Sequence, residues 1–535
     1  MGQSMSKVQE DAKIREFWIK NVSDNDKNGK TKPKEIYDFI IVGAGSAGCV
    51  LARELIHCIP NINILVLEAG GPDASTNGLI NLPCTFFKTS FQLGAQLSDN
   101  DWGYVSQEQK MQSSVNPTKE VVKKGSPYIR GKVWGGSSQA KVYNDWAAQG
   151  PEYKIWDWNN CLEAFKAVEK NSRKEPDEKF KKFHGFNGLL HVQDSQNGLY
   201  KIESGLIDAA KNLVYNQGRR RCSLAESYLK DALKKVELHP DPKYDNLGKV
   251  VAVDVRSFAH VLNIIWDEKN KKENIAIGVR YFCNGTVREA FIAPKGEVIL
   301  CGGAINSPQI LMLSGIGPKE NLESNNIKVR KELPVGRNLL DHPGACIVAK
   351  STPNTIHDWS NDCEIGIIHK ANVEGKIPCK DDFFDESPDI QIIAATYQDG
   401  FLDTAIELYR KKHNKFDGLI MMPLFNMPSS VGYLELGSNN PFDQPKIYFN
   451  FYERPNDLYR MISSLKLCRE ILKQPPLSTV YDVKEIGIND EFGQWCTNGN
   501  DMSDEDWENG NTNTPTTMVA WRASRLIIED FMGKC

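Results

Sequence analysis

Apolar positions near the start of the chain fall into two runs of strand length with a helical segment between them. Residues 36–42 (IYDFIIV) form the first run and end at a glycine, and residues 49–55 (CVLAREL) follow with helical spacing. Residues 62–67 (INILVL) form the second run and end in Glu68. A strand, a glycine turn, a helix and a second strand in this order predict a βαβ unit of a parallel sheet.

Four later segments also carry a clear pattern. Residues 262–266 (LNIIW) and 298–300 (VIL) have the composition of buried strands. Residues 427–436 alternate as in an antiparallel strand. Residues 456–473 place their apolar side chains on one face, which predicts an amphipathic helix.

The composition is that of an ordinary globular protein of at least two domains, with 535 residues, 40% hydrophobic and 25% charged. A net charge of −4 favours no nucleic-acid partner. No apolar run is long enough to span a bilayer, and residues 1–35 lack the apolar stretch of a secretory signal. The 13 cysteines are scattered without CxxC pairs. We therefore expect a cytoplasmic protein with reduced cysteines and no metal site.

The N-terminus fits the pattern for N-myristoylation of Gly2, because residues 1–7 read MGQSMSK with a serine at position 6. Coincidence is the alternative, since glycine falls at any position about 7% of the time. A single myristoyl chain gives only marginal, reversible membrane binding. The segment predicts at most a weak membrane association, and both interpretations stay open.

Residues 43–48 (GAGSAG) join the first strand to the helix. Glycines at this spacing allow a tight turn, close approach of the backbone to a pyrophosphate, and close packing of helix on strand. The pyrophosphate would rest on the N–H groups that open the helix. Glu68, 20 residues after Gly48, stands where a ribose hydroxyl is held. The segment predicts a dinucleotide site but does not distinguish NAD from FAD.

Five further segments resemble motifs of the glucose-methanol-choline (GMC) oxidoreductase family, and they occur in the family's order. The resemblance is closest to the arthropod glucose dehydrogenase-like branch, and it implies FAD as the cofactor. The five segments are residues 68–71 (EAGG), 101–104 (DWGY), 128–138 (YIRGKVWGGSS), 296–318 and 333–343 (LPVGRNLLDHP).

The resemblance implies an α/β, Rossmann-like FAD-binding domain assembled from discontinuous segments. It also implies an α+β substrate-binding cap that contains an antiparallel sheet. The expected boundaries are an N-terminal extension of residues 1–35, an FAD-binding domain of residues 36–150, 200–345 and 496–535, and a substrate-binding domain of residues 151–199 and 346–495.

The resemblance also assigns the cofactor contacts residue by residue. Val261 would offer backbone groups to the adenine, and we interpret His260 and His342 as structural residues in connections of the cofactor domain. The full set implied is Gly43, Gly45, Ser46, Ala47, Gly48, Glu68, Ala69, Arg130, Gly135, Gly136, Ser137, Val261, Gly303, Asn513, Thr514 and Pro515.

Family members oxidise an alcohol in two linked transfers. A histidine takes the hydroxyl proton, the carbinol carbon gives hydride to the flavin N5, and a second histidine or asparagine positions the hydroxyl. Residues 511–518 (NTNTPTTM) resemble the family's NTNAPT element and place Asn513 at that second catalytic position. Thr514 is suited to cap the helix that follows, and Pro515 fits its first turn.

The catalytic histidine itself has no counterpart. The last of nine histidines is His413, and the family's HPVGTCxMG motif and its GLRVVDAS strand are both absent. Residues 503–508 resemble the family sequence just before the missing part, and residues 509–511 resume just after it. Two smaller departures are Lys141, where relatives place asparagine, and Val431, which replaces an arginine.

Three hypotheses follow. The first is an FAD-dependent oxidoreductase acting on an alcohol or sugar-like substrate, with activity impaired because losing a general base costs about 10² to 10⁴ in rate. The second is a catalytically inactive FAD-binding or regulatory pseudoenzyme. The third is an incomplete splice form or gene model. The sequence leaves open the substrate, the electron acceptor and the oligomeric state.

Overall fold

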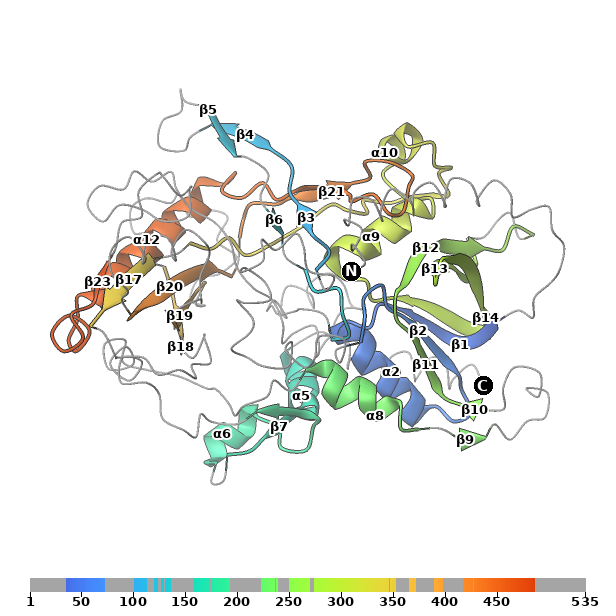
Figure 1. Ribbon diagram of the computed structural model, residues 1–535, viewed down its shortest axis with the longest axis horizontal. Helices are drawn as coiled ribbons and strands as arrows, with labels where there is room; N and C mark the ends of the chain where they lie inside the picture. Colours follow the sequence, from blue (N-terminus) through green and yellow to red (C-terminus); the bar gives the residue numbers. More distant parts are fainter. Residues whose placement is uncertain are drawn as a thin grey trace, which may run out of the picture.

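The computed structural model contains two bodies, each built around a β-sheet (Figure 1). The predictions for Gly2, Gly136, Ser137, Lys141 and residues 496–535 lie outside the part of the chain that the structure describes. That part comprises residues 35–72, 101–112, 120–123, 127–128, 130–135, 158–173, 176–192, 223–235, 237–238, 250–269, 274–345, 347–352, 365–371, 389–397, 417–426 and 428–485.

A six-stranded mixed sheet forms the first body. β1 pairs in parallel with β2 and β14, and β2 pairs in parallel with β11, whereas β12, β13 and β14 form an antiparallel meander. The parallel strands at the centre are covered on both faces, which explains their continuous apolar runs. In spatial order the strands are β11 (Val253–Arg256), β2 (Ile64–Leu67), β1 (Glu35–Val42), β14 (Thr286–Leu300), β13 (Ala276–Cys283) and β12 (Ala259–Trp266).

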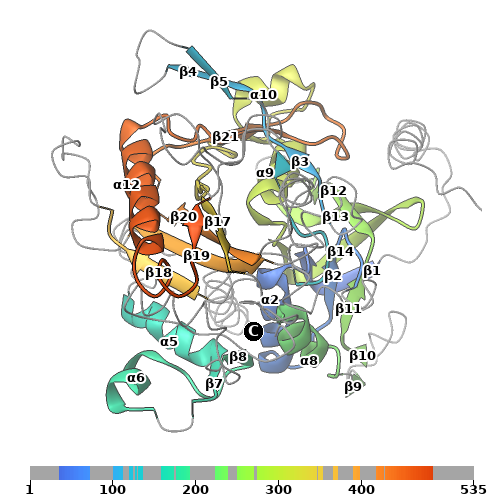
Figure 2. The ribbon, with the colours of Figure 1, turned by 60° about the vertical axis from the view of Figure 1, so that its left-hand side comes forward.

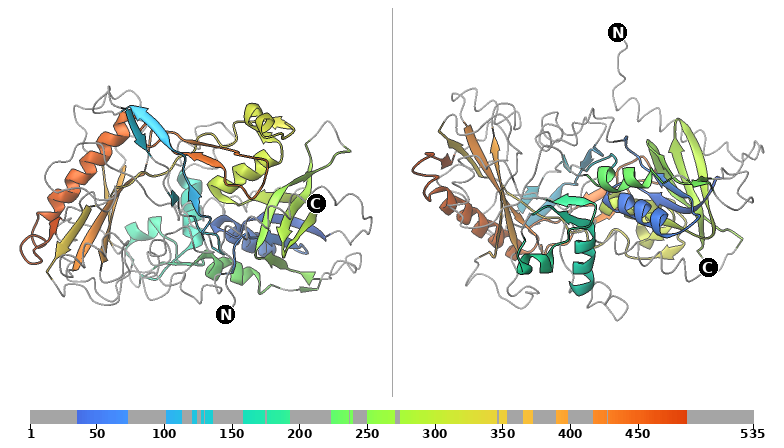
Figure 3. Two further views of the ribbon diagram at one scale, coloured as in Figure 1. Left: turned by 45° about the horizontal axis from the view of Figure 1, so that its top comes forward. Right: turned by 90° about the horizontal axis from the view of Figure 1, so that it is seen from below.

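Helices cover the two faces of this sheet. On one face, α2 (Ser46–Cys58) packs with the π-helix η6 (Ala225–Leu229) and with α8 (Lys230–Ala232), and Figure 3 shows α2 and α8 side by side. On the other face, α9 (Gly303–Leu313) contributes Ile310 to a core shared with β1, β2, β12 and β13. Each fully buried aliphatic side chain stabilises the fold by about 1.5–3 kcal/mol. Because α2 lies between β1 and β2 in the chain and β1 pairs in parallel with β2, the predicted βαβ unit is confirmed.

A five-stranded antiparallel sheet forms the second body, and α12 (Pro455–Leu472) lies along it (Figure 2). The helix predicted over residues 456–473 is confirmed, and Leu458, Met461 and Leu465 are buried on its apolar face. In spatial order the strands are β18 (Ile365–His369), β19 (Ile390–Tyr397), β20 (Asp417–Phe425), β17 (Ile347–Ser351) and β23 (Lys484–Glu485).

One of three hydrophobic clusters among the described residues joins the two bodies. Ile305 and Met312 of α9 belong to the same buried cluster as Phe425 of β20 and Met461 of α12. The predicted fold class, a mixed α/β sheet with a separate antiparallel sheet, is confirmed.

The remaining short elements are β3 (Tyr104–Val105), β4 (Gln109–Gln112), β5 (Glu120–Lys123), β6 (Pro127–Tyr128), α5 (Trp158–Val168), β7 (Glu169–Asn171), α6 (Glu178–Phe183), β8 (Leu190–Val192), β9 (Glu237–Leu238), β10 (Val250–Val251), β15 (Ile316–Gly317), α10 (Lys319–Ser324), β16 (Lys331–Glu332), β21 (Tyr433–Glu435) and β22 (Lys446–Tyr448).

The strand predicted over residues 427–436 is only partly right. β21 covers its last residues, but the preceding backbone N–H groups of Ser429 and Ser430 donate to the carboxylate of Asp457 instead of to a neighbouring strand. Gly432 then passes so close to β22 that a Cβ would lie 2.2 Å from the carbonyl oxygen of Tyr448. Capping by a distant carboxylate cannot be read from local alternation.

No helix among the described residues is both long and apolar enough to cross a membrane. Within the same residues there is also no group of three or more histidine, cysteine or acidic side chains that is arranged to hold a metal ion.

Candidate functional site

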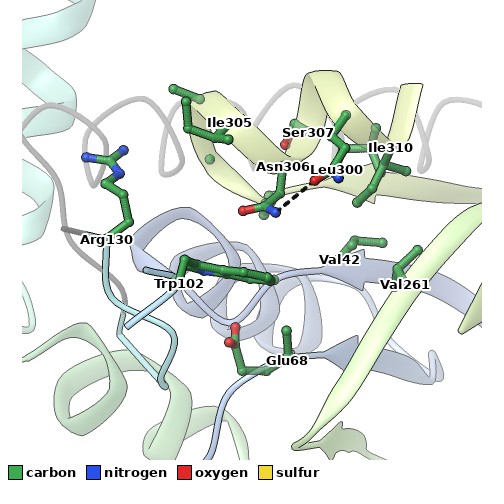
Figure 4. Close-up of a pocket in the computed structure, with 18 of the residues that line it drawn as sticks. Val42, Glu68, Trp102, Arg130, Val261, Leu300, Ile305, Asn306, Ser307 and Ile310 are labelled. Carbon is green, nitrogen blue, oxygen red and sulfur yellow. Dashed lines mark hydrogen bonds between the residues drawn. The ribbon is translucent and has the colours of Figure 1, made fainter. Parts of the chain in front are cut away.

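A cavity of about 550 Å³ lies where β1 and β14 end and where α2 and α9 begin. Pockets for small molecules and cofactors span roughly 300–1,000 Å³, so this volume is in the normal range. Figure 4 shows Arg130 at one side of the cavity and Val42 and Val261 at the other, with Trp102 between them. The carboxyl ends of parallel strands gather side chains from distant segments at one edge of the sheet, where ligands of open α/β sheets bind.

The glycine turn between β1 and α2 has a shape that only glycine permits. Gly43 has φ = 103°, and a Cβ on it would lie 2.5 Å from the carbonyl oxygen of Cys301. A Cβ on Gly48 would lie 1.9 Å from the carbonyl oxygen of Gly43, so α2 packs directly on the turn. The turn therefore fixes the first turn of α2 at the cavity wall, where Ser46 and Ala47 line it.

Two helices begin at this cavity, and neither has a side-chain hydrogen bond at its N-cap. The N-cap residues are Gly45 for α2 and Gly302 for α9, and both line the cavity. Gly303 has φ = 78°, and a Cβ there would meet nothing within 4 Å. The first N–H groups of a helix and its dipole favour an anion. Two such helix ends at one cavity suit a diphosphate.

Glu68 is almost fully buried, with 6% of its surface exposed. Its Oε2 accepts a hydrogen bond from the N–H of Ala44 at 2.7 Å, and its Oε1 accepts one from Gly70 at 2.8 Å. Burial raises the pKa of Glu68, while these two bonds and the nearby Lys132 oppose the rise. Each carboxylate oxygen keeps a second lone pair, so the group has the capacity to accept a hydroxyl as well.

An aromatic wall faces this carboxylate side of the cavity. Trp102 stacks on Tyr104 with ring centroids 5.9 Å apart, and the ammonium of Lys132 lies 5.1 Å from the Trp102 ring centroid. The hydroxyl of Tyr104 donates to Oδ1 of Asn306 at 2.7 Å, and burial raises the Tyr104 pKa. The side chain of Asn306 in turn donates to Gln309 at 3.3 Å. This chain of hydrogen bonds ties β3 to α9.

Sequence reasoning did not assign Trp102, Tyr104, Asn306 or Gln309 to the site. The first two belong to the DWGY motif, whose position alone could have marked them. Asn306 and Gln309 belong to the motif of residues 296–318, which could have marked them in the same way. Besides the bond between them, Asn306 bonds Tyr104 and Gln309 bonds the carbonyl of Asp443, both more than 100 residues away, which a local pattern does not reveal.

His260 lies inside β12, so its predicted place in a connection is wrong, because the strand already starts at Ala259. Its Nε2 is 3.0 Å from the carbonyl oxygen of Pro441, and since a carbonyl only accepts, Nε2 carries the proton. Burial, together with Lys132, lowers the pKa of His260 to about 4, so the ring is neutral near pH 7. His342 is buried between β16 and β17 and does not line the cavity.

The structure brings most of the predicted cofactor contacts together. Gly48 and Gly135 do not line the cavity but brace the turn, and the N–H of Gly135 donates to the carbonyl of Ala44 at 2.8 Å. Asn513, Thr514 and Pro515 lie outside the described residues. The predicted residues that line the cavity are Gly43, Gly45, Ser46, Ala47, Glu68, Ala69, Arg130, Val261 and Gly303.

Comparison with known families decides between the dinucleotides. Residues 37–344 match the N-terminal family model of the GMC oxidoreductases, and residues 428–523 match the C-terminal one. The chain belongs to the GMC oxidoreductase family. The homologues and structural neighbours of the chain in this family are FAD-binding flavoproteins, so the predicted cofactor, FAD, is confirmed.

Curated relatives match over most of their length. The chain is 28% identical to an alcohol dehydrogenase (acceptor) of Pseudomonas putida over 486 residues, which cover 83% of this chain and 79% of the relative. It is 30% identical to an oxygen-dependent choline dehydrogenase of Staphylococcus saprophyticus over 500 residues, which cover 86% of this chain and 82% of the relative. The mitochondrial choline dehydrogenase of Mus musculus is 28% identical over 501 residues, covering 83% and 74%.

Solved structures share the fold. A formate oxidase of Aspergillus oryzae superposes with a TM-score of 0.65 at 17% identity, covering 94% of this chain and 99% of that one. A pyridoxine 4-oxidase of Mesorbium loti superposes with a TM-score of 0.62 at 18% identity, covering 91% and 86%. These similarities support the GMC-type FAD-binding fold with its mixed sheet and separate antiparallel sheet.

Proposed function

We propose that the protein holds the ADP half of FAD in the cavity between α2 and α9. We further propose that it oxidises the CH–OH group of an alcohol or sugar-like substrate at a rate reduced by the absence of a catalytic histidine. The observation that carries the first part is the convergence of two uncapped helix N-termini and the buried Glu68 on one cavity. The histidine content of the sequence carries the second part.

The described residues fit the ADP half of FAD group by group. The N–H groups at the start of α2 and of α9 suit its pyrophosphate. The spare lone pairs of Glu68 suit a ribose hydroxyl, and a buried carboxylate would repel a 2′-phosphate. Val261 lies at the end of the cavity opposite Arg130, which leaves the adenine beside β12 and directs the flavin toward Arg130 (Figure 4).

When bound, FAD supplies an acceptor for hydride at the flavin N5. The chain would supply Asn513, which the sequence places at the position that holds the substrate hydroxyl. No histidine follows His413, so the hydroxyl proton would pass to solvent water and not to the usual imidazole base. Loss of a general base costs about 10² to 10⁴ in rate, which is the reduction we expect.

Optical spectroscopy of the purified full chain tests this proposal. The protein, reconstituted with FAD, should be yellow and should bleach slowly when choline or another alcohol is added without oxygen. A colourless protein that takes up no FAD would refute the binding half of the proposal. A yellow protein that no alcohol bleaches would refute the catalytic half.

A second candidate is an FAD-binding or regulatory pseudoenzyme, and the missing HPVGTCxMG motif favours it. The two candidates differ in one observable, the bleaching of bound flavin by an alcohol.

The motifs of the sequence also support membership in the arthropod glucose dehydrogenase-like branch of the family and the domain boundaries at residues 150, 200, 345 and 496.

Weak membrane association through Gly2 is a separate proposal that rests on residues 1–7. Intact mass of the N-terminal peptide from a eukaryotic host tests it. A mass increase equal to one myristoyl group supports the anchor, and an unmodified Gly2 removes it.

A further inference from the structure

We propose that residues 436–445 form a strap that closes the adenine end of the cavity, and that opening of this strap controls how fast FAD enters and leaves. The strap is the loop between β21 and β22, and its sequence is LGSNNPFDQP. The proposal rests on the proposed function, because it takes FAD to be the occupant of the cavity. Figure 1 shows β21 reaching from the second body toward α9.

The strap supplies one wall of the cavity. Among the described residues beyond 345, Pro441 alone lines it, and Pro441 is buried. Its carbonyl accepts the hydrogen bond from His260, which is adjacent to Val261 at the end of the cavity opposite Arg130. Displacing the strap would therefore open the cavity at the end assigned to the adenine.

The strap is anchored by β12, β13 and α9 of the cofactor-binding body and by the segment just before β3. The ring of Phe442 stacks on His260 of β12 at 4.9 Å and meets Phe282 of β13 edge-on at 5.6 Å. Gln309 of α9 donates to the carbonyl of Asp443 at 2.8 Å. Gln444 donates to the carbonyl of Gly103, just before β3, at 2.8 Å. His260 and Gln309 themselves line the cavity, so the contacts that hold the strap are at the cavity wall.

The strap is internally compact, which allows it to move as a unit. The carboxylate of Asp443 accepts from the hydroxyl of Ser438 at 2.6 Å and from the amide of Asn440 at 3.0 Å. The N–H of Phe442 donates to the side chain of Asn440 at 3.2 Å. These bonds stay intact when the anchors break. The N-terminal end is fixed separately, because Asn321 of α10 bonds both the N–H and the carbonyl of Leu436.

The strap lies outside the regular strands, so it opens without breaking a strand pair. Opening requires the loss of a small number of hydrogen bonds and ring contacts, each of modest net strength. In this proposal FAD passes the open strap in both directions. Weakening the anchors therefore raises the uptake rate and the release rate by the same factor and leaves the affinity nearly unchanged. A residue that only touches FAD would change the release rate alone.

The variant Phe442→Ala in the full-length chain tests the strap, because Phe442 anchors it but does not line the cavity. The matched control is Tyr448→Ala, which removes a stacked ring from the same hairpin, where Tyr448 packs on Tyr433 at 4.6 Å. The uptake of FAD by the apoprotein and its release from the holoprotein are followed by flavin absorbance and fluorescence. Loss of anchors of about the strength of one hydrogen bond predicts that both rates rise about fivefold or more in Phe442→Ala and stay unchanged in the control.

Gln444→Ala is the second variant and protects the test against misfolding of the first, since Gln444 is exposed. It should raise both rates by a smaller factor. The strap proposal would be overturned by unchanged rates of FAD uptake and release in both variants, or by a change in the release rate alone. If the wild-type chain binds FAD but these rates do not move, only the strap fails. If the wild-type chain takes up no FAD, the proposed function fails and the strap as a cofactor gate fails with it.

Discussion

At the scale of single residues, the backbone geometry at Gly43 requires a glycine, whether or not a ligand is bound. Its φ of 103° is a conformation that other residues rarely adopt, and a Cβ would press against the backbone of Cys301. The clash arises because β1 and β14 pair in parallel and end side by side, with Val42 opposite Leu300. The motif was predictable because its spacing is local, whereas the contact with Cys301 depends on a strand about 250 residues away.

We predict that Gly43→Ala destabilises the protein by about 2–4 kcal/mol, since it adds a backbone clash to the strain of a positive φ. Gly285→Ala is the matched control, because Gly285 has φ = 73° but a Cβ there meets nothing within 4 Å. The control should cost only about 1–2 kcal/mol. Urea unfolding followed by circular dichroism measures both, and equal losses would show that the clash is relieved at no cost.

Glu68 leads to a prediction on pH. Its ionised carboxylate accepts two backbone N–H groups, and burial raises its pKa. As the pH falls through that raised pKa, the protonated group loses one acceptor, so FAD affinity should begin to fall at a higher pH than an ordinary carboxyl group would give. Fluorescence titration with FAD between pH 4 and pH 8 measures this, within the range where the fold persists.

Glu68→Gln is the control for this pH dependence. The amide places a donor against either Ala44 or Gly70, so affinity for FAD should be about tenfold lower or more at pH 7. The acid-side loss of affinity should disappear, because the titrating group is gone. If the variant keeps the wild-type pH profile, another group is responsible.

At the scale of elements, α12 was predictable because its apolar face repeats with helical spacing, and Pro455 fits its first turn. The order of the large sheet was not predictable in the same way. β1 is flanked by β14, which lies far along the chain, and the meander of β12 and β13 attaches beyond it. Strand order depends on long-range pairing, which local apolar runs do not encode.

Asp457 gives the element-scale prediction. It is fully buried in the first turn of α12, and its carboxylate accepts the N–H groups of Ser429 and Ser430 at 2.8–3.1 Å. Asp457→Ala leaves the buried N–H of Ser430 without this partner and removes the acceptor of the more exposed Ser429, so we expect a loss of about 2–4 kcal/mol in unfolding free energy. Glu470→Ala is the control, because Glu470 lies on the exposed surface of the same helix beside Lys473. Urea unfolding compares them, and similar losses would contradict the structural role of Asp457.

At the scale of the whole molecule, the cavity draws on segments that extend from β1 to the strap. The sequence pattern predicted the glycine turn and Glu68, because each follows directly on an apolar strand, and the family resemblance implied Gly303. It did not predict Trp102, Asn306 or Pro441, whose neighbours at the cavity come from segments far away in the sequence. These separate segments converge on the one cavity that we propose as the nucleotide site.

The central claim is that the cavity between α2 and α9 holds the ADP half of FAD, and a competition titration tests it most directly. The purified full-length apoprotein is titrated with FAD, and then with FAD in the presence of ADP. The account predicts saturation at one FAD per chain and competitive displacement by ADP. Absence of FAD binding, or FAD binding that excess ADP leaves unchanged, would contradict it.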